Sequence, residues 1–192
     1  SILDSEYLGI STVSVINQMN PDVACVGNHE LDYGISHSLL MEKLAKFPMI
    51  NANIYVKYFN KRLFAPYYIK SFNGQNVLFI GLITREMAGQ LLVDKNIGPL
   101  IEIHDPVEEV RKVIEEVKAS GIPVYATYLL THIGIGADIE LAEKLDPSLG
   151  VCAILGGHSH TLTEEPAVVN GIPIVQAGWG TDYVGRFDVY ID

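Results

Sequence analysis

Short apolar runs alternate with longer segments of helical periodicity along the chain, and this pattern predicts one α/β domain over residues 1–192. Helices are expected over residues 6–19, 34–47, 105–121 and 137–145. Strands are expected over residues 22–26, 49–53, 124–130, 151–155, 172–178 and 183–191, with a β-hairpin over 65–83. Helices placed between strands are typical of a parallel or mixed sheet with covered faces, which puts functional groups at the carboxyl ends of strands.

Local signals support two of these elements. Asp105 has the right residue type and position to cap the helix over 105–121, Pro106 suits its first turn, and Gly121 follows its end. Asn73 and Gly74 suit the tight turn of the hairpin. No internal repeat or Pro/Gly-rich linker divides the chain, so a single domain is expected.

Polar residues follow three of the expected strands directly. The sequences "GNHE", "THIG" and "GGHSH" come after the apolar runs that end at residues 26, 130 and 155, and they hold four of the six histidines. Neutral imidazole nitrogens and an amide oxygen that converge on one sheet edge suit Zn, Mn, Fe or Co. His158 and His160 alternate by two, so both point to one side of an extended segment. The combination predicts a metal site.

The two remaining histidines and Trp179 lie outside these three motifs. His37 lies on an expected helix and His104 just before the start of another, and we interpret both as structural. Trp179, flanked by glycines, is interpreted as packing. Glu30 either supports the site from behind or is simply paired with a neighbour.

Composition narrows the classes of partner. A formal net charge of −10 argues against a nucleic acid or an anionic membrane surface, because both are polyanions. No apolar stretch approaches the ~18 residues of a membrane span, and no signal peptide opens the chain. Cys25 and Cys152 sit in apolar runs and are expected to be small buried thiols, with a disulfide left open.

Several linked motifs resemble one known family. "GNHELDYG", "THIG" and "GGHSHT", flanked by "NAN" and by "VNGIPIVQAGWGTDYVGRFDV", are similar in type and order to the 5'-nucleotidase/UDP-sugar hydrolase branch of the calcineurin-like metallophosphoesterases. The resemblance covers nearly the whole chain. It implies an αββα sandwich, here incomplete on its N-terminal side.

The resemblance also implies a role for each residue. Asn28, His132 and His158 would hold one divalent metal, and His160 would contribute to a second. His29 would be the catalytic imidazole, and Asp32 would orient it. Spacing supports this pair independently, because residues three apart on a helical turn share a face.

The activity implied is metal-dependent hydrolysis of phosphate esters of nucleotides. Two cations, each Zn, Mn, Co or Fe, would activate a water and clamp the phosphoryl oxygens. Their positive charge would also offset the negative net charge of the protein when an anionic nucleotide binds. The motifs do not separate 5'-nucleotidase, UDP-sugar hydrolase and 2',3'-cyclic phosphodiesterase. The alternative is a non-catalytic binding or scaffolding module that retains the fold.

The chain also departs from the family pattern. An Asp-x-His motif and a Gly-Asp motif, which supply the remaining ligands, would lie upstream of Ser1, and we assign neither Asp4 nor Asp22 to their place. A C-terminal nucleotide-binding domain would lie downstream. We therefore expect the chain to be weakly active or inactive alone. The family implies a periplasmic, cell-wall or extracellular location, and the sequence makes no prediction of oligomeric state.

Overall fold

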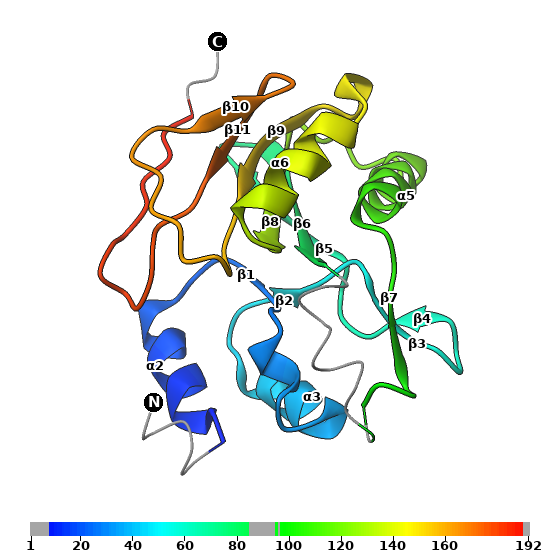
Figure 1. The fold of residues 1–192 in the computed structure, drawn as a ribbon. Coiled ribbons are helices and arrows are strands. Elements are labelled where there is room, and N and C mark those ends of the chain that lie inside the picture. The colour runs from blue at the N-terminus through cyan, green and yellow to red at the C-terminus, as the bar shows by residue number, and fades with distance from the viewer. Residues whose placement is uncertain (1–7, 85–94, 96, 190–192) are drawn as a thin grey trace.

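A mixed six-stranded sheet forms the centre of the molecule (Figure 1). The computed structural model describes residues 8–84, 95 and 97–189. The strand order is β10-β11-β9-β8-β6-β5, with bounds β5 (Tyr67–Phe72), β6 (Gln75–Ile83), β8 (Ala126–His132), β9 (Val151–Leu155), β10 (Ala167–Val169) and β11 (Ile172–Val175). Strands β6, β8, β9 and β11 are parallel, and the two outer strands pair antiparallel with their neighbours. The carboxyl ends of the parallel strands therefore meet at one edge.

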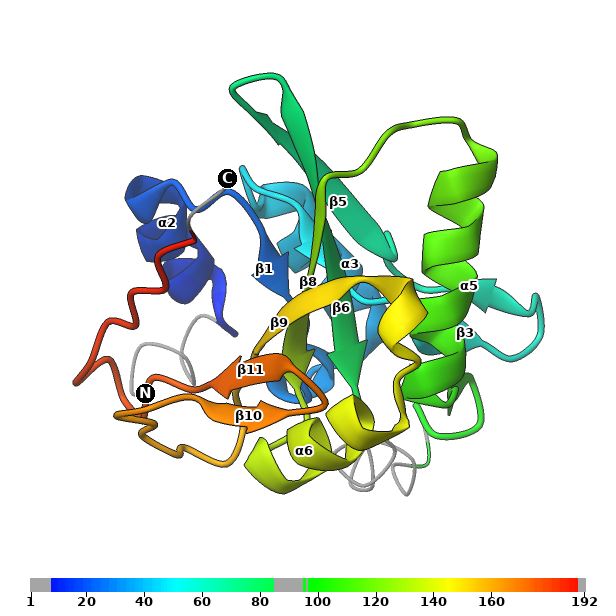
Figure 2. The same cartoon turned by 90° about the horizontal axis from the view of Figure 1, so that it is seen from above.

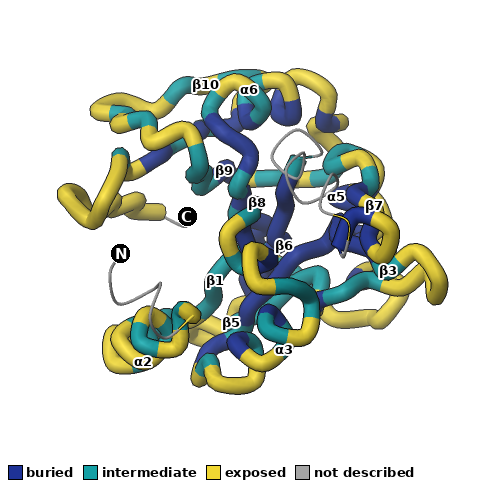
Figure 3. Tube along the Cα trace, turned by 60° about the horizontal axis from the view of Figure 1, so that its bottom comes forward, coloured by how far each residue is buried: buried dark blue, intermediate teal, exposed yellow. Residues whose placement is uncertain are grey.

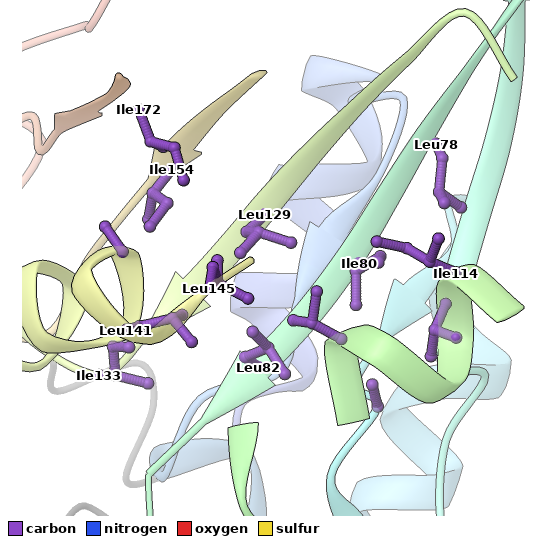
Figure 4. Close-up of a cluster of buried hydrophobic side chains, with 14 of the residues drawn as sticks. Leu78, Ile80, Leu82, Ile114, Leu129, Ile133, Leu141, Leu145, Ile154 and Ile172 are labelled. Carbon is purple, nitrogen blue, oxygen red and sulfur yellow. The ribbon is translucent and has the colours of Figure 1, made fainter. Parts of the chain in front are cut away.

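Two helices cover one face of this sheet (Figure 2). They are α5 (Pro106–Ala119) and α6 (Ile135–Lys144). Their apolar sides pack on the alternate strand residues that point the same way, including Leu78, Ile80 and Ile154 (Figure 4). This cluster is the larger hydrophobic core. Its packing fixes the positions of the strand ends from which the polar loops start.

The other face carries β1 (Ala24–Cys25), β2 (Met49–Ile50) and the helices α2 (Ile10–Met19) and α3 (Ile35–Leu44). Strand β2 crosses β6 so closely that a Cβ at Gly81 would lie 2.3 Å from the carbonyl oxygen of Ile50. Only glycine fits there. The layers thus run from helices through the sheet and the β1–β2 pair to helices again, which confirms the predicted α/β sandwich.

The remaining elements are small. They are η1 (His29–Leu31), η2 (Pro147–Leu149) and a three-stranded sheet of β4 (Lys61–Arg62), β3 (Ile54–Val56) and β7 (Ile101–Ile103). Burial is greatest along the central strands, whereas α2 and the last described residues are largely exposed (Figure 3). No helix in the described ranges is both long enough and apolar enough to cross a bilayer.

Most predicted elements are present, several of them shorter than expected. The hairpin is confirmed, and its turn residues Asn73 and Gly74 have φ of 50° and 84°. Helix α5 begins as predicted, since the Asp105 side chain accepts a hydrogen bond from the amide of Glu108. The expected helix over 6–19 starts at Ile10 within the described residues, and its first two positions lie outside them.

Two expectations are wrong. The strand expected over 183–191 is not formed at residues 183–189, where Val184 is 95% exposed, and its last two positions lie outside the described residues. This segment has no ladder partner among the described residues, and β-propensity expresses fit to a paired, half-buried surface. Cys152 is exposed on β9 rather than buried, at an irregularity in the pairing with β8, where Val151 and Ala153 have partners and Cys152 has none on that strand. Both cysteines are free thiols.

Candidate active site

Three strand ends bring three of the four predicted metal ligands together at the carboxyl edge of the sheet. Asn28 follows β1, His132 is the last residue of β8, and His158 follows β9. Strands β8 and β9 are parallel neighbours, so their ends lie side by side. Strand β1 lies next to both β8 and β6. The positions are therefore set by strand pairing rather than by the loops alone.

The three side chains meet at their polar tips. Nε2 of His132 lies 2.8 Å from Oδ1 of Asn28 and 3.2 Å from Nδ1 of His158. The two imidazole rings are 5.0 Å apart and nearly perpendicular. Asn28 Oδ1 and an unprotonated Nδ1 of His158 are both acceptors, and the single proton that Nε2 of His132 can carry serves only one of these two contacts well. Two imidazoles and an amide oxygen in this geometry fit a borderline divalent metal.

The sequence around the ligands makes room for this convergence. A Cβ at Gly27 would lie 2.9 Å from the ring of His132, inside normal contact distance. Glycine before Asn28 therefore lets the imidazole pack against the β1 end. Among the described residues, no three histidine, cysteine or acidic side chains form a metal-holding group, and this cluster has two histidines and an asparagine.

The environment keeps the cluster imidazoles neutral. Burial first, then repulsion from positive charge on His158, His29 and His160, lowers the pKa of His132 to about 4. Burial also lowers the pKa of His158, together with repulsion from His160 and His29. Neutral imidazole is the form that binds a metal, so protons compete weakly for these nitrogens near neutral pH.

This shift predicts acid sensitivity of the metal-free chain. An unfolded histidine titrates near pH ~6.5, whereas folded His132 titrates at about 4, so the unfolded state binds more protons in between. The His132 contribution to stability is therefore complete above the unfolded pKa and is lost as pH falls toward the folded one. Urea unfolding of the parent chain and His132→Ala at pH 7 and pH 4.5 measures it. We expect the parent to lose on the order of 2 kcal/mol more than the variant, and equal losses would contradict this.

His29 and Asp32 form an exposed pair beside the cluster. Nδ1 of His29 lies 2.8 Å from Oδ2 of Asp32, and their side chains are 76% and 45% exposed. The 3₁₀ turn η1 puts both on one side, three residues apart, while Asn28 points elsewhere. A carboxylate on Nδ1 leaves Nε2 of His29 available for a ligand.

Glu30 has a structural role in this loop. Its Oε2 accepts a hydrogen bond of 2.7 Å from the amide of Gly27, which closes the turn that carries Asn28 and His29. Burial raises the pKa of Glu30, against the hydrogen bond from Gly27 that lowers it. This bond pairs Glu30 with a neighbour and also supports the loop that carries Asn28 and His29, so it agrees with both interpretations of Glu30.

The structure does not bring His160 into contact with the other three predicted ligands. It is exposed, has a φ of 55°, and its ring lies 6.0 Å from that of Trp179. Its part in a second metal site stays a prediction. His104, by contrast, stacks on Tyr55 with ring centroids 3.8 Å apart, as expected of a structural histidine.

Sequence patterns missed three polar residues behind the cluster, namely Asp138, Ser159 and Gln176. Asp138 and Gln176 are buried, and burial raises the pKa of Asp138 to about 6, against hydrogen bonds from Thr131 and Gln176 that lower it. Only Asp138 had a signal in the sequence, because it is a carboxylate in the first turn of an amphipathic helix. A carboxylate at such a position is usually solvated.

Comparisons with known proteins identify relatives over most of the chain. A 5'-nucleotidase of Vibrio cholerae is 35% identical over 200 residues, which is 90% of this chain and 35% of the relative. The chain thus spans about a third of the length of the curated relatives it matches. No family model matches the chain.

Solved structures give the same result. A 5'-nucleotidase precursor from Thermus thermophilus has a TM-score of 0.79 and 31% identity, over 93% of this chain and 37% of the other. The calcineurin-like phosphoesterase YfkN from Bacillus subtilis has a TM-score of 0.75 and 27% identity, over 86% of this chain and 57% of the other. By sequence and by fold, the chain is therefore homologous to the 5'-nucleotidases of the calcineurin-like phosphoesterase family, over part of their length.

Proposed function

We propose that this chain is the metallophosphoesterase domain, over residues 1–192, of an enzyme that hydrolyses phosphate esters of nucleotides with the help of divalent metal ions. One observation carries the proposal: Nε2 of His132 lies within contact distance of both Oδ1 of Asn28 and Nδ1 of His158, at 2.8 and 3.2 Å. The printed names of the relatives supply the substrate class.

Each residue has a distinct part in the proposed chemistry. Asn28, His132 and His158 would hold one cation, and His160 would contribute to a second. Bound cations would supply a nucleophilic hydroxide at neutral pH and charge stabilisation for the phosphoryl oxygens. Proton donation and the orientation of the proton donor would be carried out by protein side chains.

His29 is the proposed acid. Nδ1 of His29 lies 2.8 Å from Oδ2 of Asp32, so that Nε2 of the ring is left for the substrate. From there it would donate a proton to the leaving alkoxide or a hydrogen bond to the phosphoryl oxygen. The 76% exposure of His29 gives a bulky ester access to it.

Hydrolysis of p-nitrophenyl phosphate and AMP, with Mn²⁺ or Co²⁺, tests the proposal. It should be measured on this chain with the metal and again after treatment with a chelator. We expect hydrolysis that the chelator removes and added metal restores, because the proposed mechanism needs a bound cation. No hydrolysis in the presence of either metal would favour a non-catalytic binding module. The family implies a periplasmic, cell-wall or extracellular location, which we include in the proposal.

A further inference from the structure

Gln176, just after β11, contacts the loop over residues 156–160, here called the histidine loop, on both sides of His158. Its side chain is buried. Nε2 donates hydrogen bonds to Oδ2 of Asp138 at 3.0 Å and to the carbonyl oxygen of Gly157 at 3.1 Å. Oε1 accepts a hydrogen bond of 2.9 Å from Oγ of Ser159. One amide therefore holds the residues immediately before and after His158.

Asp138 fixes the orientation of this amide. Its Oδ1 accepts a 2.6 Å hydrogen bond from Thr131, the residue directly before His132, and its Oδ2 faces Nε2 of Gln176. Exchanging the oxygen and nitrogen of Gln176 would set acceptor against acceptor at both Asp138 and Gly157. The histidine loop passes close over Asp138 and Gln176, since a Cβ at Gly156 would lie 2.2 Å from Oδ2 of Asp138.

The start of α6 holds the same loop from a second direction. The amide of Gly134 donates to the carbonyl of Gly157 at 3.0 Å, and the amide of Ile135 donates to Oγ of Ser159 at 3.0 Å. These bonds act on a segment in an unfavourable conformation, because His158 and His160 have φ of 81° and 55°. Left-handed backbone at residues other than glycine persists only where the surroundings impose it.

We propose that Gln176, oriented by Asp138, is a positioning residue that presets His158 and His160 for metal binding. The inference rests on the proposed function for its consequence, but the order of the loop is a property of the metal-free chain. The amide does not reach the metal or the substrate. It acts through Gly157 and Ser159 on the backbone that carries the two imidazoles.

Asn170 provides a matched control. Its Nδ2 donates to the carbonyl oxygens of Leu145 at 3.0 Å and Ala142 at 3.4 Å, at the opposite end of α6. Replacing it removes side-chain amide bonds from the same helix without touching the histidine loop. Asn170 also has a φ of 53°, a conformation in which alanine is strained, so Asn170→Ala reports the effect of a lost amide and of general destabilisation away from the histidine loop.

The test compares Gln176→Met and Asn170→Ala with the parent in the full chain. Methionine keeps the length of glutamine and removes its hydrogen bonds. The first measurement is amide hydrogen exchange of Gly134 and Ile135 without metal, relative to amides of β8, and the second is Co²⁺ affinity. We expect Gln176→Met to speed exchange of both amides about tenfold and to weaken Co²⁺ binding about 10–100-fold. Asn170→Ala should change neither.

Ser159→Ala is a second variant, at an exposed position with little risk to folding. It should speed exchange of Ile135 while leaving Gly134 protected. Unchanged exchange of both amides in Gln176→Met would overturn the positioning role, whatever the metal result. Absence of Co²⁺ binding by the parent would contradict the proposed function instead, and amide exchange would still decide whether Gln176 orders the loop.

Discussion

Replacing His132 by alanine is expected to lower phosphate-ester hydrolysis by about 10³-fold and to remove metal binding at the cluster. A metal acting as a Lewis acid supplies several kcal/mol of transition-state stabilisation, and each ~1.4 kcal/mol is a factor of ten. His132 would be the central ligand of the proposed site, because its Nε2 contacts both Asn28 and His158. Metal content and kcat/KM on p-nitrophenyl phosphate measure the two effects.

His104→Ala is the matched control for this variant. His104 is also a partly buried imidazole, but it stacks on Tyr55 and approaches Glu109, outside the cluster. The His104→Ala protein should keep metal content and kcat/KM within about twofold of the parent, since the contacts of His104 with Tyr55 and Glu109 lie outside the cluster. A His132→Ala protein that keeps full metal content and rate would place the active metal elsewhere.

His29→Ala is expected to lower kcat by about 10²–10⁴-fold on AMP, the range typical of a positioned general acid. Metal affinity should not change, because the ring of His29 does not share the contact point of Asn28 and His132. The free energy of unfolding should also stay within about 0.5 kcal/mol of the parent, as for other exposed sites.

The choice of ester separates the two possible roles of His29. If it protonates the leaving alkoxide, the loss on p-nitrophenyl phosphate should be much smaller than on AMP, because p-nitrophenolate leaves without a proton. Asp32→Asn should produce a weaker version of the same pattern, since it keeps a hydrogen-bond acceptor for Nδ1 and loses the charge. Equal losses on both esters would assign His29 to charge stabilisation rather than proton transfer.

Local signals made the position of the site predictable. An apolar run followed by Gly-Asn-His-Glu or Gly-Gly-His marks the end of a buried strand, and parallel pairing of β8 and β9 puts such ends at one edge. The cap of α5 and the turn at Asn73 and Gly74 were equally local. Each of these features depends on a few adjacent residues.

The hydrogen bonds that hold the histidine loop in place could not be predicted in this way. Asp138, Gln176 and Ser159 lie on α6, after β11 and in the histidine loop, so their contacts exist only once the sheet and helix have packed. The left-handed φ of His158 follows from those contacts rather than from its own residue type. The same reason explains the error over residues 183–189, where an apolar pattern finds no partner strand among the described residues.

Anomalous diffraction from crystals of the chain grown with Co²⁺ examines the metal site without any assumption about activity. We expect a cation about 2.0–2.2 Å from Nε2 of His132, with Nδ1 of His158 and Oδ1 of Asn28 as neighbouring ligands. The present contacts between these atoms would then be replaced by bonds to the cation. Crystals that contain Co²⁺ bound only elsewhere, with the three tips still touching one another, would contradict a metal-dependent mechanism at this edge of the sheet.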